Sequence, residues 1–247
     1  MSDRGDDERA SGPLDDALGI LAEGDLQPLG LMPGASNYTF LSEVCREDRS
    51  VLAIYKPRAG EAPLWDFPEG TLCRREVAAY ALASELGWPL VPPTVLRDGP
   101  HGEGSVQLFV DADLEQHFFT LRRTRLADFL QVAAFDVVVN NADRKAGHCL
   151  LDGDGRVWLV DHGVCFHVMP KLRTVIWEFA GDRVPAPIRD DLRALAGSLR
   201  AGSLRRTMLE LLDRPEVDAT ADRAERLASK GRFPEPGSGR PYPWPPI

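Results

Sequence analysis

The chain has 247 residues, of which 43 % are hydrophobic and 27 % are charged, proportions typical of an ordinary globular protein. They exclude a wholly disordered chain, a collagen-like repeat and a fibrous coiled coil. The 38 acidic residues outnumber the 29 basic ones, and the formal charge of −9 argues against broad binding to nucleic acids or to anionic membranes.

The first residues, 1–16, are acidic and contain no apolar run, so we expect a disordered, solvated tail and not a signal peptide. Asp136 interrupts the most apolar stretch of the chain, and no transmembrane helix is expected. We therefore expect a cytoplasmic protein without stable membrane association. The cysteines are far apart and form no Cys-x-x-Cys pair, which indicates reduced, mostly buried thiols: Cys45, Cys73, Cys149 and Cys165.

The first half of the chain is predicted to be rich in strands. Residues 39–44 and 50–57 flank a polar stretch and resemble an antiparallel hairpin. Residues 72–87 have a helical composition, and residues 91–98 and 102–110 are predicted to form two more strands.

The second half is predicted to be rich in helices. Apolar residues recur at helical spacing over 124–141, and a polar loop and a short hairpin follow at 142–163. Further helices are expected near 187–200, 203–213 and 217–229. The sequence thus predicts an α+β fold with two lobes, a strand-rich N-lobe (17–112) and a helix-rich C-lobe (113–232).

The C-terminal segment 233–247 contains six prolines, which exclude a regular helix or a central strand. We expect it to be extended and to lie along the folded body, with the rings of Tyr242 and Trp244 buried. The alternative is a free polyproline linker.

A lysine at a strand end and a glutamate on the following helix form the first candidate pair. Lys56 ends the strand VLAIYK, and Glu76 lies near the start of the predicted helix. A carboxylate on a neighbouring helix can hold a lysine charged and extended toward phosphates. Taken alone the pair is weak, because strand lysines and helix glutamates are common.

Two aspartates at the ends of the predicted hairpin form a more specific pattern. Asp143 lies in the loop NNADRKAGH, and Asp161 begins the triplet Asp-His-Gly, 18 residues later. Phosphoryl transfer needs one carboxylate to orient the acceptor hydroxyl and another to hold a metal ion. The alternative is a pair of turn aspartates in an ordinary hairpin.

A turn of small residues precedes the first predicted hairpin. Its backbone N–H groups could approach a triphosphate, although it matches neither common glycine-rich phosphate motif and could be a simple turn. The candidate residues are Gly34, Ala35, Ser36 and Asn37.

Together these residues resemble the atypical branch of the protein-kinase-like fold, which contains the phosphatidylinositol 3- and 4-kinases and bacterial persistence-toxin kinases. The segment FDVVVNNADR is similar to the entry into the catalytic loop of that branch. The sequence also resembles an uncharacterised group of actinobacterial proteins labelled as phosphatidylinositol-kinase-like. The resemblance spans about residues 30–230, and its specific motifs lie at 140–163.

The resemblance implies a role for each candidate residue. Lys56 would contact the α- and β-phosphates of ATP, Glu76 would hold Lys56, Asp143 would be the catalytic aspartate, and Asp161 would be the main ligand of a divalent cation, Mg²⁺ or Mn²⁺. The hinge that binds adenine would fall at the segment that includes Gln107, Phe109 and Val110.

Two positions depart from the family. His148 stands where the family has a metal-binding asparagine, so a second metal site would have a nitrogen ligand, which suits Mn²⁺ or Zn²⁺ better than Mg²⁺. We expect this histidine to titrate near its ordinary pKa of about 6.5. After the Asp-His-Gly triplet only His167, Lys171 and Arg173 are basic, fewer than a phosphoinositide acceptor would need.

The predicted function is therefore an ATP-dependent kinase that acts on a hydroxyl acceptor, a protein or small molecule in preference to a lipid, without nucleic acid as a partner. One alternative is a pseudokinase that binds nucleotide, or nothing, and acts as a scaffold. Another is a structural zinc module, suggested by the spacing of cysteines and histidines: His148, Cys149, His162, Cys165 and His167.

Overall fold

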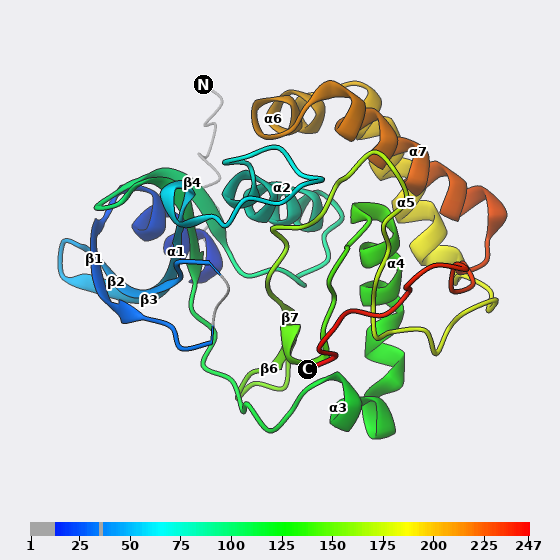
Figure 1. The fold of residues 1–247 in the computed structure, drawn as a ribbon, viewed down its shortest axis with the longest axis horizontal. Coiled ribbons are helices and arrows are strands. Elements are labelled where there is room, and N and C mark those ends of the chain that lie inside the picture. Colours follow the sequence, from blue (N-terminus) through cyan, green and yellow to red (C-terminus); the bar gives the residue numbers. More distant parts are fainter. Residues whose placement is uncertain (1–12, 35–36) are drawn as a thin grey trace, which may run out of the picture.

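A computed structural model describes residues 13–34 and 37–247 and shows a five-stranded antiparallel sheet followed by a helix-rich region (Figure 1). The strands are ordered β1-β2-β3-β5-β4. The N-terminal elements are α1 (Pro13–Glu23), β1 (Asp25–Leu31), β2 (Phe40–Arg46), β3 (Arg49–Pro57), the 3₁₀ turn η1 (Arg58–Gly60), α2 (Leu72–Glu85), β4 (Thr94–Gly99) and β5 (Gly102–Leu108).

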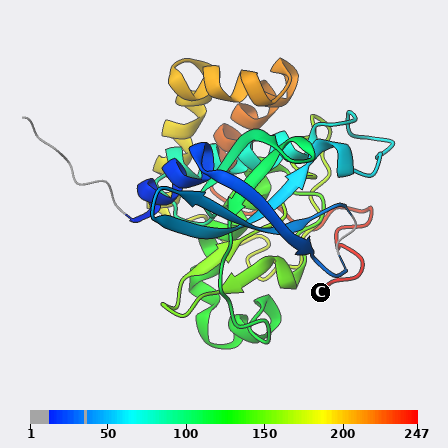
Figure 2. The same ribbon diagram turned by 90° about the vertical axis from the view of Figure 1, so that its left-hand side faces the viewer.

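The remainder of the chain contains the helices that pack together and one small hairpin. Seen from the side of the sheet, the strands lie across the front of the molecule and the helix-rich part extends behind them (Figure 2). The elements are α3 (Phe118–Arg125), η2 (Leu126–Asp128), α4 (Phe129–Val139), η3 (Ala146–His148), β6 (Cys149–Leu151), β7 (Val157–Leu159), α5 (Ala186–Arg200), α6 (Ser203–Leu211) and α7 (Arg214–Lys230).

The α+β class, with the strands first and the helices after them, is confirmed. The predicted strands and the short hairpin at 149–163 are present, and the three C-terminal helices occur close to the expected positions. Three elements were missed: β1 is the edge strand of the sheet, α1 includes residues 13–16 of the expected tail, and α3 lies mostly before the predicted helix over 124–141. Residues 1–12 lie outside the described residues.

The predicted helix over 124–141 is observed as α4 alone, and a 3₁₀ turn separates α4 from α3, which lies mostly before the predicted range. The rings of Phe118 and Phe129 lie edge to face with their centroids 4.9 Å apart. In one continuous helix, residues 11 apart would be separated by about 16 Å along the axis. The chain therefore folds back between the two helices so that both rings enter the core.

The hydrophobic core has two main parts. One lies between α1 and the sheet and includes Leu21, Val44 and Tyr55. The other is larger, surrounds α4, and also contains the apolar face of α2, including Ala78 and Leu82. Helix α2 lies in the sequence of the N-lobe but packs into the core of the C-lobe.

Polar contacts fasten the first turn of α2. The carboxylate of Glu61 accepts the free backbone N–H groups of Leu72 and Cys73, at 3.0 and 2.8 Å. The fully buried guanidinium of Arg75 donates to Glu216 of α7 and to the carbonyl oxygen of Cys165, both at 2.7 Å. These bonds fix the helix to the C-lobe, since a buried charge without its partner is costly.

The C-terminal segment is extended and lies along the body, as predicted. The carbonyl oxygen of Pro241 accepts the N–H of Thr174 at 3.0 Å, and that of Pro246 accepts the N–H of Ala146 at 2.8 Å. The predicted burial of the rings is wrong, because Tyr242 is 50 % exposed and Trp244 is 75 % exposed. The backbone carbonyls hold the segment, so its attachment does not require the rings.

Two other expectations can be compared with the structure. The four cysteines are unpaired, and only Cys45 is partly exposed, so reduced and mostly buried thiols are confirmed. Among the described helices, none is both long enough and apolar enough to cross a membrane.

Candidate functional site

Lys56 meets two carboxylates from different parts of the chain. Alternate side chains of β3, including Tyr55, are buried in the sheet core, and Lys56 therefore points from the other face. Its ammonium group is bonded to the carboxylate of Glu76 on α2 and lies 3.1 Å from Oδ1 of Asp161. The structure thus brings together three of the residues that the sequence singled out.

Charge stabilises this cluster in its ionised form. Burial alone would lower the pKa of Lys56, but Asp161 and Glu76 raise it above its ordinary value. Conversely, the positive charge of Lys56 holds the pKa of Asp161 well below its usual range. The side chain of Asp161 is 50 % exposed, so a ligand can reach its ionised carboxylate.

The Asp-His-Gly triplet follows β7 and is held against α2. The backbone N–H of His162 donates to Oε2 of Glu76 at 2.8 Å, while the other carboxylate oxygen faces Lys56. Asp161 has a left-handed backbone with φ of 62°, a conformation that is uncommon outside glycine. Glu76 therefore positions both the lysine and the backbone that presents Asp161.

Asp143 lies in the loop after α4 and is one-third exposed. Its backbone N–H donates to Oδ1 of Asn141 at 2.9 Å, and its carboxylate lies 3.2 Å from Nζ of Lys145. Burial raises its pKa, the charge of Lys145 lowers it, and the nearby negative charge of Asp161 raises it further. The two aspartates are thus close enough to influence each other, as the hairpin pattern predicted.

The next residue, Arg144, forms a buried frame behind the site. Its guanidinium is fully buried and binds both carboxylate oxygens of Asp136 at 3.1 Å. It also donates to the carbonyl oxygen of Val160 at 2.9 Å and lies 2.8 Å from Nε2 of His162. One side chain thus connects α4 with the residues on either side of Asp161.

This bond defines the state of His162. Because a guanidinium only donates, Nε2 of His162 accepts and the ring is neutral with its proton on Nδ1. Burial, followed by the charge of Arg144, holds the pKa of His162 well below its ordinary value. The Nδ1 atom is buried without a hydrogen-bond partner and lies 3.9 Å from Glu76.

His148 contacts the proposed metal ligand directly. Its Nε2 lies 3.3 Å from Oδ2 of Asp161, and its Nδ1 accepts the backbone N–H of Lys145 at 3.4 Å. The proton of the neutral ring is therefore placed on Nε2, where it faces the carboxylate. Burial lowers the pKa of His148 to about 4, so the expected titration near 6.5 is wrong.

The small-residue turn connects β1 to β2 and is therefore part of a hairpin, which the sequence did not reveal. Gly34 has a φ of 78°, which favours glycine. Asn37 accepts the backbone N–H of Ala62 at 2.7 Å and so ties the turn to the segment after β3. Ala35 and Ser36 lie outside the described residues.

The expected hinge lies at the end of β5, where the chain leaves the sheet for the C-lobe. The side chain of Gln107 is buried and donates to the hydroxyl of Thr94 at 2.9 Å. The backbone N–H of Phe109 donates to the carbonyl oxygen of Leu52 at 2.9 Å. Val110, the last of the predicted hinge residues, follows these two contacts in the chain and takes part in neither of them.

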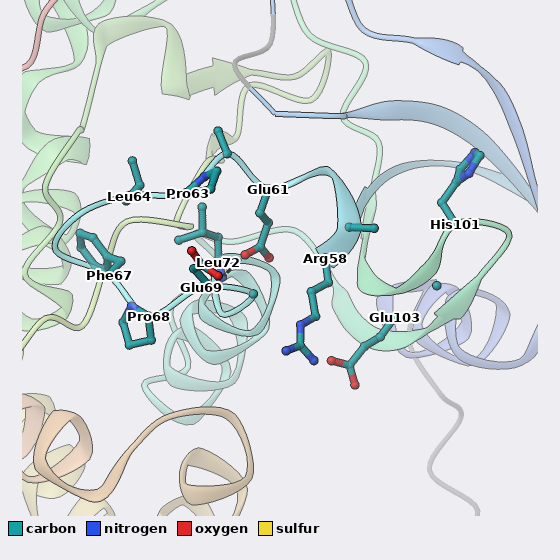
Figure 3. Close-up of a pocket in the computed structure, with 14 residues that line it drawn as sticks. Arg58, Glu61, Pro63, Leu64, Phe67, Pro68, Glu69, Leu72, His101 and Glu103 are labelled. Atoms are coloured by element: carbon teal, nitrogen blue, oxygen red, sulfur yellow. Dashed lines mark hydrogen bonds between the residues drawn. The ribbon is translucent and has the colours of Figure 1, made fainter.

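A cavity of about 500 Å³ lies beside this cluster and does not include Lys56, Asp143 or Asp161 among its lining residues. Figure 3 shows Glu61, Phe67 and Leu72 on one side of it and Glu103 and His101 on the other. It is formed by the loop between β3 and α2 and by the β4–β5 turn. The cavity is therefore separate from the charged cluster formed by Lys56, Glu76 and Asp161.

No group of three or more histidine, cysteine or acidic side chains is placed to hold a metal ion within residues 13–34 and 37–247. Cys149 and Cys165 are fully buried, and burial raises the pKa of the Cys149 thiol to about 12. A thiol must lose its proton to bind zinc. The structure thus gives the zinc module no support.

Sequence reasoning missed the frame formed by Arg144 and Asp136, and the pair formed by Arg75 and Glu216. A signal existed for the first pair, because Asp136 is the one charge in an apolar helix and such a charge needs a buried partner. No comparable signal existed for Arg75, whose partner lies 141 residues away.

No protein-family model matches this chain. Phosphatidylinositol 4-kinase gamma 4 of Oryza sativa subsp. japonica is 32 % identical over 152 residues, which cover 54 % of this chain and 26 % of that protein. The structure of the Helicobacter pylori proinflammatory kinase CtkA aligns with 84 % of this chain and 98 % of its own, with a TM-score of 0.49 and 13 % identity.

A relative of similar length is also known. Protein Rv2133c of Mycobacterium tuberculosis (strain ATCC 25618 / H37Rv) is 41 % identical in an alignment of 266 residues. The alignment covers 94 % of this chain and 95 % of that protein. The chain therefore belongs to the family of Rv2133c and is distantly similar to a plant phosphatidylinositol 4-kinase.

Proposed function

We propose that this protein binds ATP with a divalent cation between its two lobes and transfers the γ-phosphoryl group to a hydroxyl acceptor. The observation that carries the proposal is the contact of Lys56 with both Glu76 and Asp161. This contact brings together Lys56 of the sheet, Glu76 of α2 and Asp161 after β7. The partial similarity to a plant phosphatidylinositol 4-kinase supports the same reading.

The charges of the cluster suit a bound metal–nucleotide complex. Lys56 is held charged and would bind the α- and β-phosphates, while Glu76 keeps it extended. Asp161 offers a hard, ionised and half-exposed oxygen, which fits Mg²⁺ or Mn²⁺, and it would hold the cation. When bound, the cation supplies positive charge that offsets the charge of the phosphate oxygens.

Asp143 would orient the acceptor hydroxyl and accept its proton. Its raised pKa makes it a stronger base than an ordinary aspartate, and it is accessible to an acceptor. His148 then acts on Asp161 and not as a second metal ligand, because its Nε2 carries the proton that faces this carboxylate.

The adenine and the phosphates would be placed by two segments of the N-lobe. The turn that begins with Gly34 would cover the phosphates, with Asn37 anchoring it to the segment after β3. The N–H of Phe109 is already bonded to the carbonyl oxygen of Leu52, so the backbone of the next residue, Val110, would bind adenine.

The acceptor is proposed to be a protein or a small molecule in preference to a phosphoinositide. Lys171 is one of three basic side chains after the Asp-His-Gly triplet, and its Nζ lies 2.6 Å from Oδ2 of Asp66. An ammonium group that is already paired is less available to a phosphorylated head group.

A second candidate function is nucleotide binding without transfer. His148 favours it, because a nitrogen that donates to Asp161 stands where the related kinases have a second oxygen ligand. The two functions differ in one measurable respect, namely whether bound ATP loses its γ-phosphate.

The test is a phosphate-transfer assay with radiolabelled ATP, run with Mg²⁺ and with Mn²⁺ against a cell lysate, a lipid extract and the protein itself. In parallel, nucleotide affinity is measured for Lys56→Ala and Asp161→Asn. Both variants are expected to bind metal–ATP at least about tenfold more weakly, because each loses a charged contact. Arg206→Ala, at an exposed residue of α6, serves as the control.

The outcomes separate the candidates. Labelled product that is absent in the Asp161 variant supports the kinase. Tight ATP binding without product supports the nucleotide-binding alternative. Wild-type affinity in both variants would contradict any nucleotide site at this cluster.

A further inference from the structure

A second cavity lies in the C-lobe, on residues that the proposed phosphotransfer does not use. It has a volume of about 790 Å³ and is bounded by α4, by α7, by residues 168–172 and by the start of the C-terminal segment. Helices α4 and α7 pack against each other on the side of the molecule away from the sheet (Figure 1).

The floor of this cavity is apolar. It is formed mainly by Val137, Leu172, Leu227 and Phe233. Val168 closes one side and remains 45 % exposed. An apolar surface of this kind, left open in a concave site, gains free energy when an apolar group of a ligand covers it.

The rim, in contrast, is strongly basic. Four cationic side chains line the cavity against one acidic side chain, Asp222: Arg223, Arg226, Lys230 and Arg232. Asp222 is the ion-pair partner of Arg200 on α5 and its charge also acts on Arg223, so it offsets only part of the positive charge of the rim. The concentration of positive charge is unexpected in a chain with a formal charge of −9.

Two of these cations have no carboxylate partner in the described parts of the chain. Arg226 and Lys230 are exposed and are four residues apart on α7, where like charges repel each other. Arg223 adds to the positive charge, while its own donors are occupied by the carbonyl oxygens of Val138 and His167. Arg232 donates to the carbonyl oxygen of Gly181 at 2.7 Å.

We propose that this cavity binds a small amphiphile with a phosphate monoester head group and an apolar body. The apolar floor would take the body, and Arg226 and Lys230 would bind the head group. Two unpaired cations match a phosphate monoester, which carries about two negative charges at neutral pH, better than they match a carboxylate. This site is separate from the proposed nucleotide site and does not depend on phosphotransfer.

The cavity also contacts residues 167–172, which are bonded to Asn140 at the start of the loop that carries Asp143. Asn140, which lines the cavity, donates to the carbonyl oxygens of His167 and Met169, both at 2.8 Å. Its own Oδ1 accepts the N–H of Lys171 at 2.9 Å. A ligand in the cavity is therefore expected to slow hydrogen exchange at residues 167–172.

The experiment measures binding of decyl phosphate, below its micellar concentration, by titration calorimetry on the full chain. Inorganic phosphate supplies the head group alone, octyl glucoside supplies an apolar body with a neutral head, and decanoate supplies the carboxylate. Decyl phosphate is expected to bind at least about tenfold more tightly than each of the others. Equal affinity for any of the three would overturn the proposal.

Two variants locate the binding. Arg226→Glu with Lys230→Glu removes the unpaired cations, and Ala219→Trp fills the cavity from α7. Each is expected to weaken decyl phosphate binding at least about tenfold. The matched control is Arg206→Glu with Arg214→Glu, which makes the same change in net charge at exposed residues outside the cavity.

The control is expected to bind as the wild type does, and circular dichroism checks that every variant is folded. An equal loss of affinity in the control would show a general effect of net charge and would overturn the site. Unchanged affinity in the Trp variant would place the amphiphile elsewhere and would do the same.

Discussion

Asp143 and Arg144 are neighbours in the sequence but have opposite environments. The carboxylate of Asp143 is one-third exposed and has one flexible partner, Lys145. The guanidinium of Arg144 is fully buried and contacts Asp136, Val160 and His162. Arg144 fixes the backbone from which Asp143 points. We therefore expect Arg144 to stabilise the fold and Asp143 to take part in the chemistry.

The largest expected effect comes from replacing Arg144, the buried residue of the two. In Arg144→Met, Asp136 stays buried without its cation, and the free energy of unfolding is expected to fall by about 3–5 kcal/mol. Urea unfolding measures the change, with Arg206→Met as the exposed control. A loss below about 1 kcal/mol would mean that Arg144 is not needed to neutralise Asp136.

Asp143, the exposed residue of the two, is expected to affect phosphate transfer and not the stability of the fold. Asp143→Asn should lower phosphate transfer by about 10²–10⁴-fold, because the variant cannot accept the proton of the acceptor. Its affinity for metal–ATP should stay near that of the wild type, and its stability should change by less than about 1 kcal/mol. Normal transfer by this variant would reduce the loop to an ordinary turn.

Acidification tests the two histidines on either side of Asp161. The pKa of His148 is lowered to about 4 by burial, and that of His162 is also lowered, so the unfolded chain binds protons that the native chain does not. Stability is then complete above pH 6.5 and falls as the pH falls. From pH 7 to 5 the expected loss from His148 is about 2 kcal/mol, and His162 contributes a further loss in the same direction.

The variant His148→Asn removes one of these titrating groups. Its stability should therefore fall by about 2 kcal/mol less than that of the wild type between pH 7 and pH 5, as measured by urea unfolding at each pH. Its ratio of activity with Mn²⁺ to that with Mg²⁺ should match the wild type, since His148 donates to Asp161. A shift of this ratio toward Mg²⁺ would instead identify His148 as a metal ligand.

The smallest effect is expected at the C-terminal segment. Trp244→Ala removes a ring that is 75 % exposed, and the free energy of unfolding should change by less than about 0.5 kcal/mol. Thermal unfolding measures this difference. A large loss would show that the ring, and not the carbonyl oxygens of Pro241 and Pro246, holds the segment.

The sequence was sufficient for the class of fold, and the family resemblance was sufficient for the pairing of Lys56 with Glu76; the direct contact of Lys56 with Asp161 was not predicted. Periodicity and turn residues identify most elements, because each depends on local side chains. β1 was missed because Pro28 and Gly30 weaken its pattern, although an edge strand with an irregular register tolerates both.

The remaining features depend on contacts distant in the sequence. No local pattern shows that Phe118 folds back onto Phe129, or that Arg75 reaches Glu216. The pKa of His148 likewise depends on burial in the folded state, which its neighbours in the sequence do not reveal. Burial and tertiary pairing decide these features, so they require the structure.

Helix α2 couples the two lobes mechanically. Arg75 is bonded to Glu216 of α7, and the adjacent Glu76 is bonded to Lys56 of the sheet. A rotation of α2 that withdrew Glu76 from Lys56 would also break the buried pair of Arg75, at a cost of about 3–5 kcal/mol. At equilibrium fewer than about one molecule in a hundred would adopt the rotated state. The cluster therefore stays assembled in nearly all molecules unless a ligand binds the rotated state more tightly by a similar free energy.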